Sequence, residues 1–374
     1  MNHEETRCAI ALTKLPGIGT VTSKRLCMQA GSASLIWEHR HDILALLPDL
    51  PAHLVDSFSH FDQAMNHADA EMEFIVRNNI RTYTLTDEDY PGRLRSCPDA
   101  PIVMFQCGNA DLGAKHVLSV VGSRRCTDYG RDICRQLIHD LAAMVPGLLI
   151  VSGVAYGIDI NAHRAALAEG LPTVAVMAHG LDRIYPPVHR QTAAEMASHG
   201  GLLTEYVSGT KPERTNFIAR NRIIAALADA TLVVESGERS GSLITAEMAQ
   251  CYGRELLAVP GRASDIMSQG CNSLISKHRA ALIQSASDIA RVMNWGETMK
   301  KNQAPVQQNL FHELEGNEKT VCDLLSEGNT MQVNQIVVQT GLTYSEVSYA
   351  LYELESKGLV ELTGGARYRI ISTL

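Results

Sequence analysis

Six short apolar segments recur through the middle of this chain at nearly regular distances. They are 117–121, 148–151, 173–178, 201–205, 231–235 and 255–259. Their starts lie about 25 to 30 residues apart, which is the length of one strand plus one helix. The residues between them show the period of an amphipathic helix, for example at Ile133, Leu137, Leu141 and Met144. Residues 117–294 are therefore predicted to form a doubly wound, Rossmann-like α/β domain with a mostly parallel sheet.

The residues before this pattern are predicted to form a small helical domain, 1–80, of the helix-hairpin-helix or SAM-like kind. Helices are expected at Glu4–Lys14 and Thr20–Ala30, joined by Leu15-Pro16-Gly17-Ile18-Gly19. The glycines of this joint either let backbone N–H groups face a phosphate or simply let two helices pack closely, and the sequence leaves both open. The next segment, 81–116, is rich in Pro, Asp and Gly and is expected to be an irregular lead-in.

A third domain is predicted after a polar linker at 295–317. Helices are expected at Lys319–Leu325, Val333–Gln339 and Tyr344–Lys357, and two short strands flank Thr363-Gly364-Gly365. This is the outline of a winged helix-turn-helix domain over 318–374. Four Lys or Arg oppose seven Asp or Glu in it, a net charge of −3. Because phosphate contacts dominate DNA affinity, we expect this domain to bind DNA poorly and to serve protein interaction or autoregulation.

The composition limits the classes of function. A formal net charge of −8 excludes a protein coated with nucleic acid over its whole surface, but leaves room for one local basic site. The nine cysteines include no C-x-x-C pair, which favours reduced thiols in the cytosol over disulfides or a zinc site. No run approaches the ~18 apolar residues of a transmembrane helix, and no signal peptide is predicted. We expect a cytoplasmic protein without metal or cofactor.

Polar residues gather in the loops after the predicted strands. The first strand runs into Gly122, Ser123 and Arg124, followed by Arg125. Ligands of an open α/β sheet lie beyond the carboxyl ends of its strands, where backbone N–H groups favour anions, so a phosphorylated ligand is expected here. The G-x-G-x-x-G fingerprint is absent, and the loop therefore does not specify a dinucleotide.

The loop after the second strand carries Asp159 and, four residues later, His163. At that spacing the two side chains share a helix face, and a catalytic pair is one interpretation. Such pairs more often fix loops or satisfy buried groups, and no nucleophile accompanies this one. We therefore predict no catalytic residue.

A basic loop with one aromatic residue follows the fourth strand. It contains Lys211, Arg214, Phe217, Arg220, Asn221 and Arg222, and its charge between 211 and 222 is +3. Arginines bind phosphate oxygens and an exposed ring stacks on a base, which suits single-stranded nucleic acid. In the alternative interpretation, Phe217 is a core residue and the arginines pair with acids such as Glu205, Asp229 and Glu235.

A fourth loop, Ser240-Gly241-Ser242, opens a helix and is predicted to form a second anion site. The motif is weak by itself. Together with Arg124 and the basic loop it indicates several phosphates lying across the top of one sheet, as a strand of nucleic acid places them.

These loops, in this order, also make the chain resemble the DNA-processing protein A family, called DprA or Smf. The shared motifs are Tyr90-Pro91, Val120-Val121-Gly122-Ser123-Arg124, Ser152-Gly153-Val154-Ala155-Tyr156-Gly157-Ile158-Asp159, Ala162-His163, Gly180-Leu181-Asp182 with Tyr185-Pro186, Phe217, Arg220-Asn221-Arg222-Ile223-Ile224, Ser240-Gly241-Ser242 with Thr245-Ala246, Val259-Pro260-Gly261, and Gly270 with Asn272. They cover most of residues 90–280. The ordered set is specific to the family, although each piece alone is not.

The resemblance implies a non-enzymatic homodimer that binds single-stranded DNA entering the cytoplasm during natural transformation, protects it and loads a RecA-type recombinase onto it. Carried onto this chain, it places Gly122, Ser123 and Arg124 on the phosphates. Lys211 and Arg214 guide the backbone and Phe217 stacks a base. Arg220 and Arg222 add charge or hold the pocket together.

The chain departs from the family after Asn272. Ser276-Lys277-His278-Arg279-Ala280 stands where a Gly-Ala ending is typical, so we expect a different local loop, and with it a different dimer edge, beside an unchanged pocket.

Two other classes remain as alternatives. One is a Rossmann-like nucleotide-processing hydrolase, whose Gly-Gly-x-Gly-Thr-x-x-Glu signature is not met around Gly241. The other is a regulator that binds DNA through the winged helix, and the charge of −3 in that domain counts against it.

Overall fold

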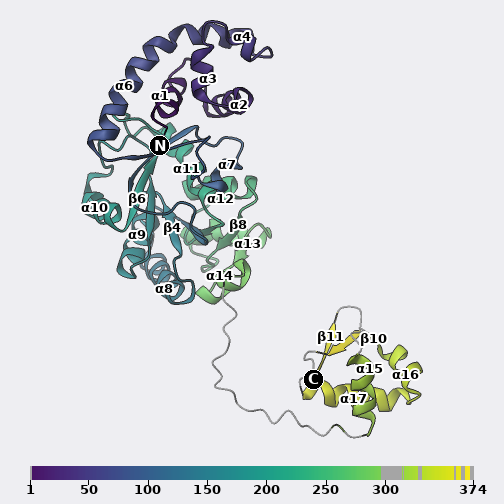
Figure 1. Ribbon diagram of the computed structural model, residues 1–374. Helices are drawn as coiled ribbons and strands as arrows, with labels where there is room; N and C mark the ends of the chain where they lie inside the picture. Colours follow the sequence, from purple (N-terminus) through teal and green to yellow (C-terminus); the bar gives the residue numbers. More distant parts are fainter. Residues whose placement is uncertain are drawn as a thin grey trace. The chain divides into compact units, whose positions relative to one another are not determined.

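The chain separates into two compact units, residues 1–297 and 298–374. The computed structural model describes residues 2–295, 314, 316–326, 331–357, 359–363 and 367–370. The first unit contains a large sheet, the helices on its faces and a cap of N-terminal helices (Figure 1). The described part of the second unit contains three helices and three strands. Most of the predicted linker lies outside the described residues.

A nine-stranded sheet forms the centre of the first unit, in the order β1-β2-β6-β5-β4-β3-β7-β8-β9. The strands are β1 Arg81–Thr84, β2 Val103–Gly108, β3 Val117–Val121, β4 Leu149–Ser152, β5 Thr173–Val176, β6 Gly200–Thr204, β7 Ala230–Val233, β8 Glu255–Ala258 and β9 Ala281–Leu282. Neighbours from β6 to β9 run parallel, whereas β2 pairs antiparallel with both β1 and β6. The six predicted strands are β3 to β8, and the predicted doubly wound, mostly parallel sheet is confirmed.

Helices cover both faces of the sheet (Figure 1). One face carries α8 Asp128–Met144, α9 Ile158–Ala168, α10 Arg190–Ser198 and α14 Ala286–Met293, and the other carries α7 Gly92–Arg95, α11 Arg214–Leu227, α12 Gly241–Cys251 and α13 Gln269–Ser276. The central strand β3 shows how the sequence specifies two faces. Leu118 and Val120 pack in the core beneath α8 and α9, whereas Val117 and Val121 belong to the core beneath α11. Successive side chains of a strand point to opposite faces, so a continuous apolar run buries both.

The lead-in segment, 81–116, is not irregular as expected. Its strands β1 and β2 extend the sheet beyond β6 by antiparallel pairing. The first four residues of β2, Val103 to Gln106, are all buried. The spacing that predicts the other strands depends on repeated parallel units, and an antiparallel pair among turn-forming residues does not follow it.

Six helices cap the first unit at its N-terminal end. They are α1 His3–Leu12, α2 Thr20–Ala30, α3 Ala33–Glu38, α4 Ile43–Leu46, α5 Ala52–Val55 and α6 Phe61–Arg77. The buried carboxylate of Glu5 accepts hydrogen bonds from the N–H groups of Ala33 and Ser34 at 2.8 and 2.9 Å and so caps α3. Gly17 turns the chain between α1 and α2 with φ +73°, which favours glycine. The carboxylate of Glu71 in α6 accepts from the N–H of Ser208 at 3.0 Å, which ties this cap to the loop after β6.

The second unit has the predicted winged-helix topology. Its elements are α15 Gly316–Ser326, β10 Met331–Gln332, α16 Val333–Thr340, α17 Tyr344–Ser356, β11 Val360–Thr363 and β12 Arg367–Ile370, and the sheet order is β10-β12-β11. Gly341 ends α16 in a left-handed conformation, and Thr343 with Glu346 forms a capping box that starts α17. Strand β10 was not predicted, because two residues leave no periodic signal. The predicted turn at Gly364-Gly365 lies outside the described residues.

Among the described residues, no helix is both long and apolar enough to cross a membrane.

Candidate nucleic-acid interface

The loops after β3, β4 and β7 are joined by backbone hydrogen bonds. The N–H of Ser123 donates to the carbonyl oxygen of Glu235 at 2.7 Å, and the N–H of Ile158 donates to that of Ser123 at 3.1 Å. Strand β3 lies between β4 and β7, and the chain order reverses there. Such a reversal leaves a crevice beyond the strand ends, which is where open α/β sheets bind ligands.

Glycines permit this close approach. A Cβ atom on Gly122 would lie 2.5 Å from Cγ1 of Ile158 and 2.9 Å from the carbonyl oxygen of Glu235. Gly157 has φ +79°, and a Cβ there would collide with the carbonyl oxygen of Ser123. The small residues that the sequence singles out in the first two loops are therefore required by packing.

The loop after β3 offers a ligand mainly its side chains, because two of its backbone N–H groups are already hydrogen-bonded within the protein. The N–H of Ser123 is bonded to Glu235, and the N–H of Arg125 donates to Oγ of Ser123 at 3.0 Å. Ser123 is 5% exposed, whereas Arg124 and Arg125 are exposed. Gly122 and Ser123 thus shape the loop, and the two guanidinium groups supply its charge.

Phe217 lies in the first turn of α11, half-buried and not in the core. The guanidinium carbon of Arg124 is 5.7 Å from the centre of its ring, and the ring of Tyr185 is 5.9 Å away at an angle of 52°. The platform, as we call Phe217, Arg124 and Tyr185, places one cation and a second aromatic ring beside the ring of Phe217. This combination binds stacked bases and a phosphate together.

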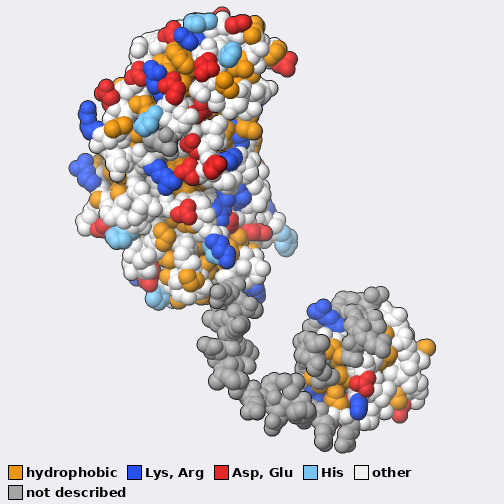
Figure 2. Space-filling view, viewed as in Figure 1, with side chains coloured by type: hydrophobic (Ala, Val, Ile, Leu, Met, Phe, Trp, Pro, Cys, Tyr) orange, Lys and Arg blue, Asp and Glu red, His pale blue; other side chains and the backbone are white. Residues whose placement is uncertain are grey.

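Lys211 and Arg214 are exposed beside the platform, and Asn221 is half-buried. Within residues 2–295, neither Lys211, Arg214 nor Arg124 forms a salt bridge, so their charges are available to an anionic ligand. On the face of the first unit shown in Figure 2, positive and negative side chains are interspersed. Attraction of a polyanion therefore depends on local clusters such as this one.

Arg220 does not reach the surface. It is 3% exposed, and Nη1 donates to the carbonyl oxygen of Val176. Burial lowers the pKa of Arg220 to about 10 and raises that of the neighbouring Asp159 to about 6, while their mutual attraction acts against both shifts. The guanidinium carbon lies 5.9 Å from the centre of the Phe217 ring. Arg220 supports the platform from inside the protein.

Arg222 is buried as well, at 7% exposure. Its guanidinium donates to the carboxylate of Glu205 and, at 2.5 Å, to the carbonyl oxygen of Asp99. The alternative interpretation of the basic loop thus holds for this arginine. The other two acids do not pair with arginines of the basic loop. Asp229 pairs with Arg93, and Glu235 accepts a hydrogen bond from Thr127.

Only some of the residues predicted to form the anion site in the fourth loop reach the surface. Ser242 is buried, and its hydroxyl donates to Oγ of Ser236 at 3.0 Å, whereas Gly241 is exposed with no atom within 4 Å of a Cβ position. Ser240 is half-buried and lies 2.8 Å from Ser242, Oγ to Oγ. The fourth loop is linked to the loop after β3 through two consecutive residues. Glu235 accepts a hydrogen bond from Ser123, and Ser236 accepts one from Ser242.

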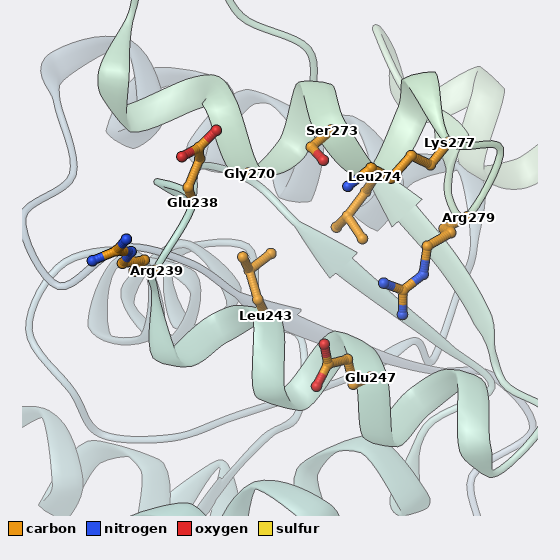
Figure 3. A pocket seen from close by; sticks show the side chains of 9 residues that line it. All are labelled: Glu238, Arg239, Leu243, Glu247, Gly270, Ser273, Leu274, Lys277 and Arg279. Carbon is orange, nitrogen blue, oxygen red and sulfur yellow. The ribbon is translucent and has the colours of Figure 1, made fainter.

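A cavity of about 320 Å³ lies beside this loop, between α12 and α13. It is lined by Glu238, Arg239, Leu243, Glu247, Gly270, Ser273, Leu274, Lys277 and Arg279. In Figure 3 Leu243 points into the space, with Arg239 at one end and Lys277 and Arg279 at the other. Lys277 and Arg279, which belong to the segment expected to depart from the family pattern, line this cavity and are not part of the platform.

His163 has a structural role. It has no exposed surface, its Nε2 is 2.7 Å from the carbonyl oxygen of Gly153, and its Nδ1 is 2.7 Å from Oγ1 of Thr173. Burial lowers the pKa of His163 to about 4. A neutral, enclosed imidazole with both nitrogens engaged cannot reach a substrate, so the interpretation of Asp159 and His163 as a catalytic pair is not supported.

Two exposed tyrosines were missing from the predicted site. Tyr185 is 47% exposed, and Tyr156, in the loop after β4, is 52% exposed with its ring 5.0 Å from that of His189. Their signal in the sequence was an aromatic residue in a strand-end loop. The first unit buries most of its large side chains, and exposed rings beside a charged loop are a feature of stacking surfaces. Among the described residues, no cluster of His, Cys, Asp and Glu is suited to a metal ion.

Comparison with known proteins identifies the class. Residues 81–294 match the model of the DNA recombination-mediator protein A family, and residues 308–366 match the DprA winged helix domain. A putative DNA processing protein DprA from Mycobacterium tuberculosis is 37% identical over 322 residues, which is 82% of this chain and 81% of that protein. The Smf protein of Escherichia coli is 35% identical over 296 residues, with 76% of this chain and 75% of that protein covered.

Two solved structures that are similar to this chain belong to the same family. The crystal structure of DprA from Streptococcus pneumoniae has a TM-score of 0.64 and 31% identity, and covers 78% of this chain and 97% of that chain. A structure of DprA from Helicobacter pylori, described by its single-stranded DNA binding mode, has a TM-score of 0.52 and 30% identity, and covers 57% and 95% of the two chains. The fold and sequence place this protein among recombination mediators. The chain belongs to the DNA recombination-mediator protein A family, DprA, as the resemblance predicted.

Replacing Arg222 by Met is expected to lower the free energy of unfolding by ~3–5 kcal/mol, because Glu205 would remain buried without its cation. Glu205→Gln together with Arg222→Met should recover most of this loss. Arg124→Ala, at an exposed position, should stay within ~0.5 kcal/mol of the parent chain. Denaturant unfolding of the four proteins measures this. A surface role for Arg222 would instead leave the stability of its variant unchanged.

Asp159 and His163 should contribute opposite pH dependences. The raised pKa of Asp159, about 6 against 3.8, gives stability that is complete below pH 3.8 and lost as the pH rises to 6. The lowered pKa of His163, about 4 against 6.5, gives stability that is complete above pH 6.5 and lost as the pH falls to 4. The variant Asp159→Asn lacks only the pH dependence that comes from Asp159. Its melting temperature should therefore fall more steeply than that of the parent chain between pH 6.5 and 4, and parallel curves would contradict these assignments.

Proposed function

We propose that the first unit binds single-stranded DNA across the carboxyl ends of its strands, with little preference among bases. The observation that carries this is the platform, in which the Arg124 guanidinium lies 5.7 Å and the Tyr185 ring 5.9 Å from the Phe217 ring. Stacking requires an open base face, which a duplex withholds and a single strand offers. Every base has such a face, so a surface of this kind accepts any sequence.

The cations around the platform suit a polymer better than one nucleotide. Arg124 and Arg125 come from the loop after β3, Lys211 from the segment between β6 and α11, and Arg214 from the first position of α11. Ser240 and Gly241 add the start of α12. We assign phosphate contacts to Arg124, Lys211 and Arg214, stacking to Phe217 and Tyr185, and the support of the site to Gly122, Ser123, Arg220, Asn221, Arg222 and Ser242.

The family supports a proposal for the cellular role. The Helicobacter relative is described by its binding of single-stranded DNA, and the family by recombination mediation. We infer that this chain, in the cytoplasm, protects incoming single strands and loads a RecA-type recombinase onto them during natural transformation, without catalysing a reaction itself.

A homodimer through the first unit is part of the proposal. Strand β9 is the last of its sheet, with one edge unpaired among the described residues, and Leu282 in it is 44% exposed. An uncovered edge with an apolar side chain favours pairing with another chain. Light scattering on the full chain is expected to give twice the chain mass, and Leu282→Asp to shift the protein toward the monomer.

Single-strand affinity should depend on the platform. Phe217→Ala is expected to weaken binding of labelled oligo-dT by ~1–3 kcal/mol, and Tyr185→Ala by a smaller amount in the same direction. Arg124→Ala and Lys211→Ala should each reduce the salt dependence by about 0.7 in the slope of log K against log salt. Fluorescence anisotropy at two salt concentrations measures both effects.

Arg135→Ala is the matched control, because Arg135 is exposed on α8 and pairs only with Asp132. It should change neither the affinity nor the slope. Equal affinity for duplex and single strand, or an unchanged affinity of Arg124→Ala, would refute the assignment of this site.

Recombinase loading should require the same residues. On single strands covered by a single-strand-binding protein, the parent chain is expected to shorten the lag of RecA ATP hydrolysis. Phe217→Ala should not shorten it at equal concentration. If the variant shortens the lag as well as the parent chain does, DNA binding at the platform is not the basis of loading.

A further inference from the structure

The winged helix exposes an unusual surface on α17, the second helix of its helix-turn-helix. Tyr344, Tyr349 and Tyr352 are 60, 67 and 67% exposed. The inward side of the same helix is formed by Val347, Ala350, Leu351 and Leu354, which are at most 1% exposed. At 3.6 residues per turn, Ser345, Tyr349, Tyr352 and Ser356 form the stripe opposite that core. The tyrosines are thus directed away from their own domain.

Carboxylates flank this stripe. Glu346 and Glu353, seven residues apart, lie along one side, and Glu355 lies on the other. Hydrogen bonding to Glu353 and the negative charge of this carboxylate raise the pKa of Tyr349. Glu346 is held in the capping box at the helix start, where its carboxylate accepts from the N–H of Thr343 at 2.8 Å.

No positive charge offsets these acids on the helix. Residues 344–356 contain neither Lys nor Arg, and the next cation, Lys357, pairs with Glu318 at 2.5 Å. The corresponding helix of DNA-binding helix-turn-helix proteins enters the major groove between two rows of phosphates. A face with three carboxylates would meet repulsion there and would release no counterions.

We propose that this face of α17 binds an arginine-rich protein segment and not duplex DNA. Guanidinium groups stack on tyrosine rings and pair with carboxylates, and here carboxylates flank a stripe that carries two tyrosines. Tyrosine and serine are also the residues that supply contact area and adaptable hydrogen bonds in protein-binding surfaces. The inference goes beyond single-strand binding, because it concerns only the second unit.

Peptide binding to the full-length chain tests this inference. The probe is a short labelled peptide of alternating Arg and Ala, compared with the same peptide carrying Gln in place of Arg. Tyr349→Ala with Tyr352→Ala should weaken binding of the arginine peptide about tenfold, whereas Tyr349→Phe with Tyr352→Phe keeps the rings and should change it less than about twofold. The Gln peptide should bind weakly to every variant.

The carboxylates have a matched control. Glu353→Gln with Glu355→Gln should weaken binding several-fold and reduce its salt dependence. Glu73→Gln with Glu88→Gln removes the same charge at exposed positions of the first unit and should have no effect. Far-UV circular dichroism and oligo-dT affinity should remain those of the parent chain in all variants, so the outcome is separate from that of the single-strand site.

Two results would overturn the proposal. One is an unchanged affinity for the arginine peptide when both tyrosines or both glutamates are replaced. The other is binding of a labelled duplex that is lost in Tyr349→Ala with Tyr352→Ala, which would make α17 a DNA-recognition helix despite its charge.

Discussion

The backbone hydrogen bond from Ser123 to Glu235 is the constraint on which the site depends. It joins the ends of β3 and β7 at the place where the chain order of the sheet reverses. The bond forms only because Gly122 has no side chain to separate the two loops from Ile158. Once the first loop is held in this way, Arg124 is exposed beside Phe217, although α11 follows β3 by some ninety residues. The platform is thus a product of sheet topology and not of local sequence.

Charge beneath the platform is as important as charge on it. Arg220 in α11 and Asp159 in the first turn of α9 are buried and attract each other, and Arg222 with Glu205 forms a buried ion pair. Buried pairs of this kind contribute little net stability, but loss of one partner is costly, so they enforce one arrangement of the surrounding loops. In the proposed binding mode, the exposed cations would meet the DNA from a position that is already fixed, which would reduce the entropy lost on binding.

The elements that follow from a repeated spacing could be predicted from the sequence, whereas the positions of individual side chains could not. Strands β3 to β8 follow from their spacing, and the site follows because parallel strands end at one edge. Which arginines of α11 face inward was predictable in principle, because Arg220 is in helical register with Ile223, Ile224 and Leu227. The charge of the basic loop, by contrast, does not distinguish the buried Arg220 and Arg222 from the exposed Lys211 and Arg214. Tyr185 comes close to Phe217 only through the packing of the loops after β5 and β6, and no pattern in one sequence contains that distance.

Aromatic rings occur on both units, and the charges beside them determine what each can bind. Phe217 and Tyr185 are accompanied by Arg124, Lys211 and Arg214, so their stacking energy is available to a polyanion with open ring faces. Tyr349 and Tyr352 are accompanied by Glu353 and Glu355, so the same kind of stacking is available to a planar cation. A helix-turn-helix is therefore insufficient evidence for DNA binding, because the fold positions the helix and the residues on its exposed stripe decide the partner. The two proposed surfaces share no residue, so the proposals imply no competition for the same side chains between a nucleic acid and a basic protein segment.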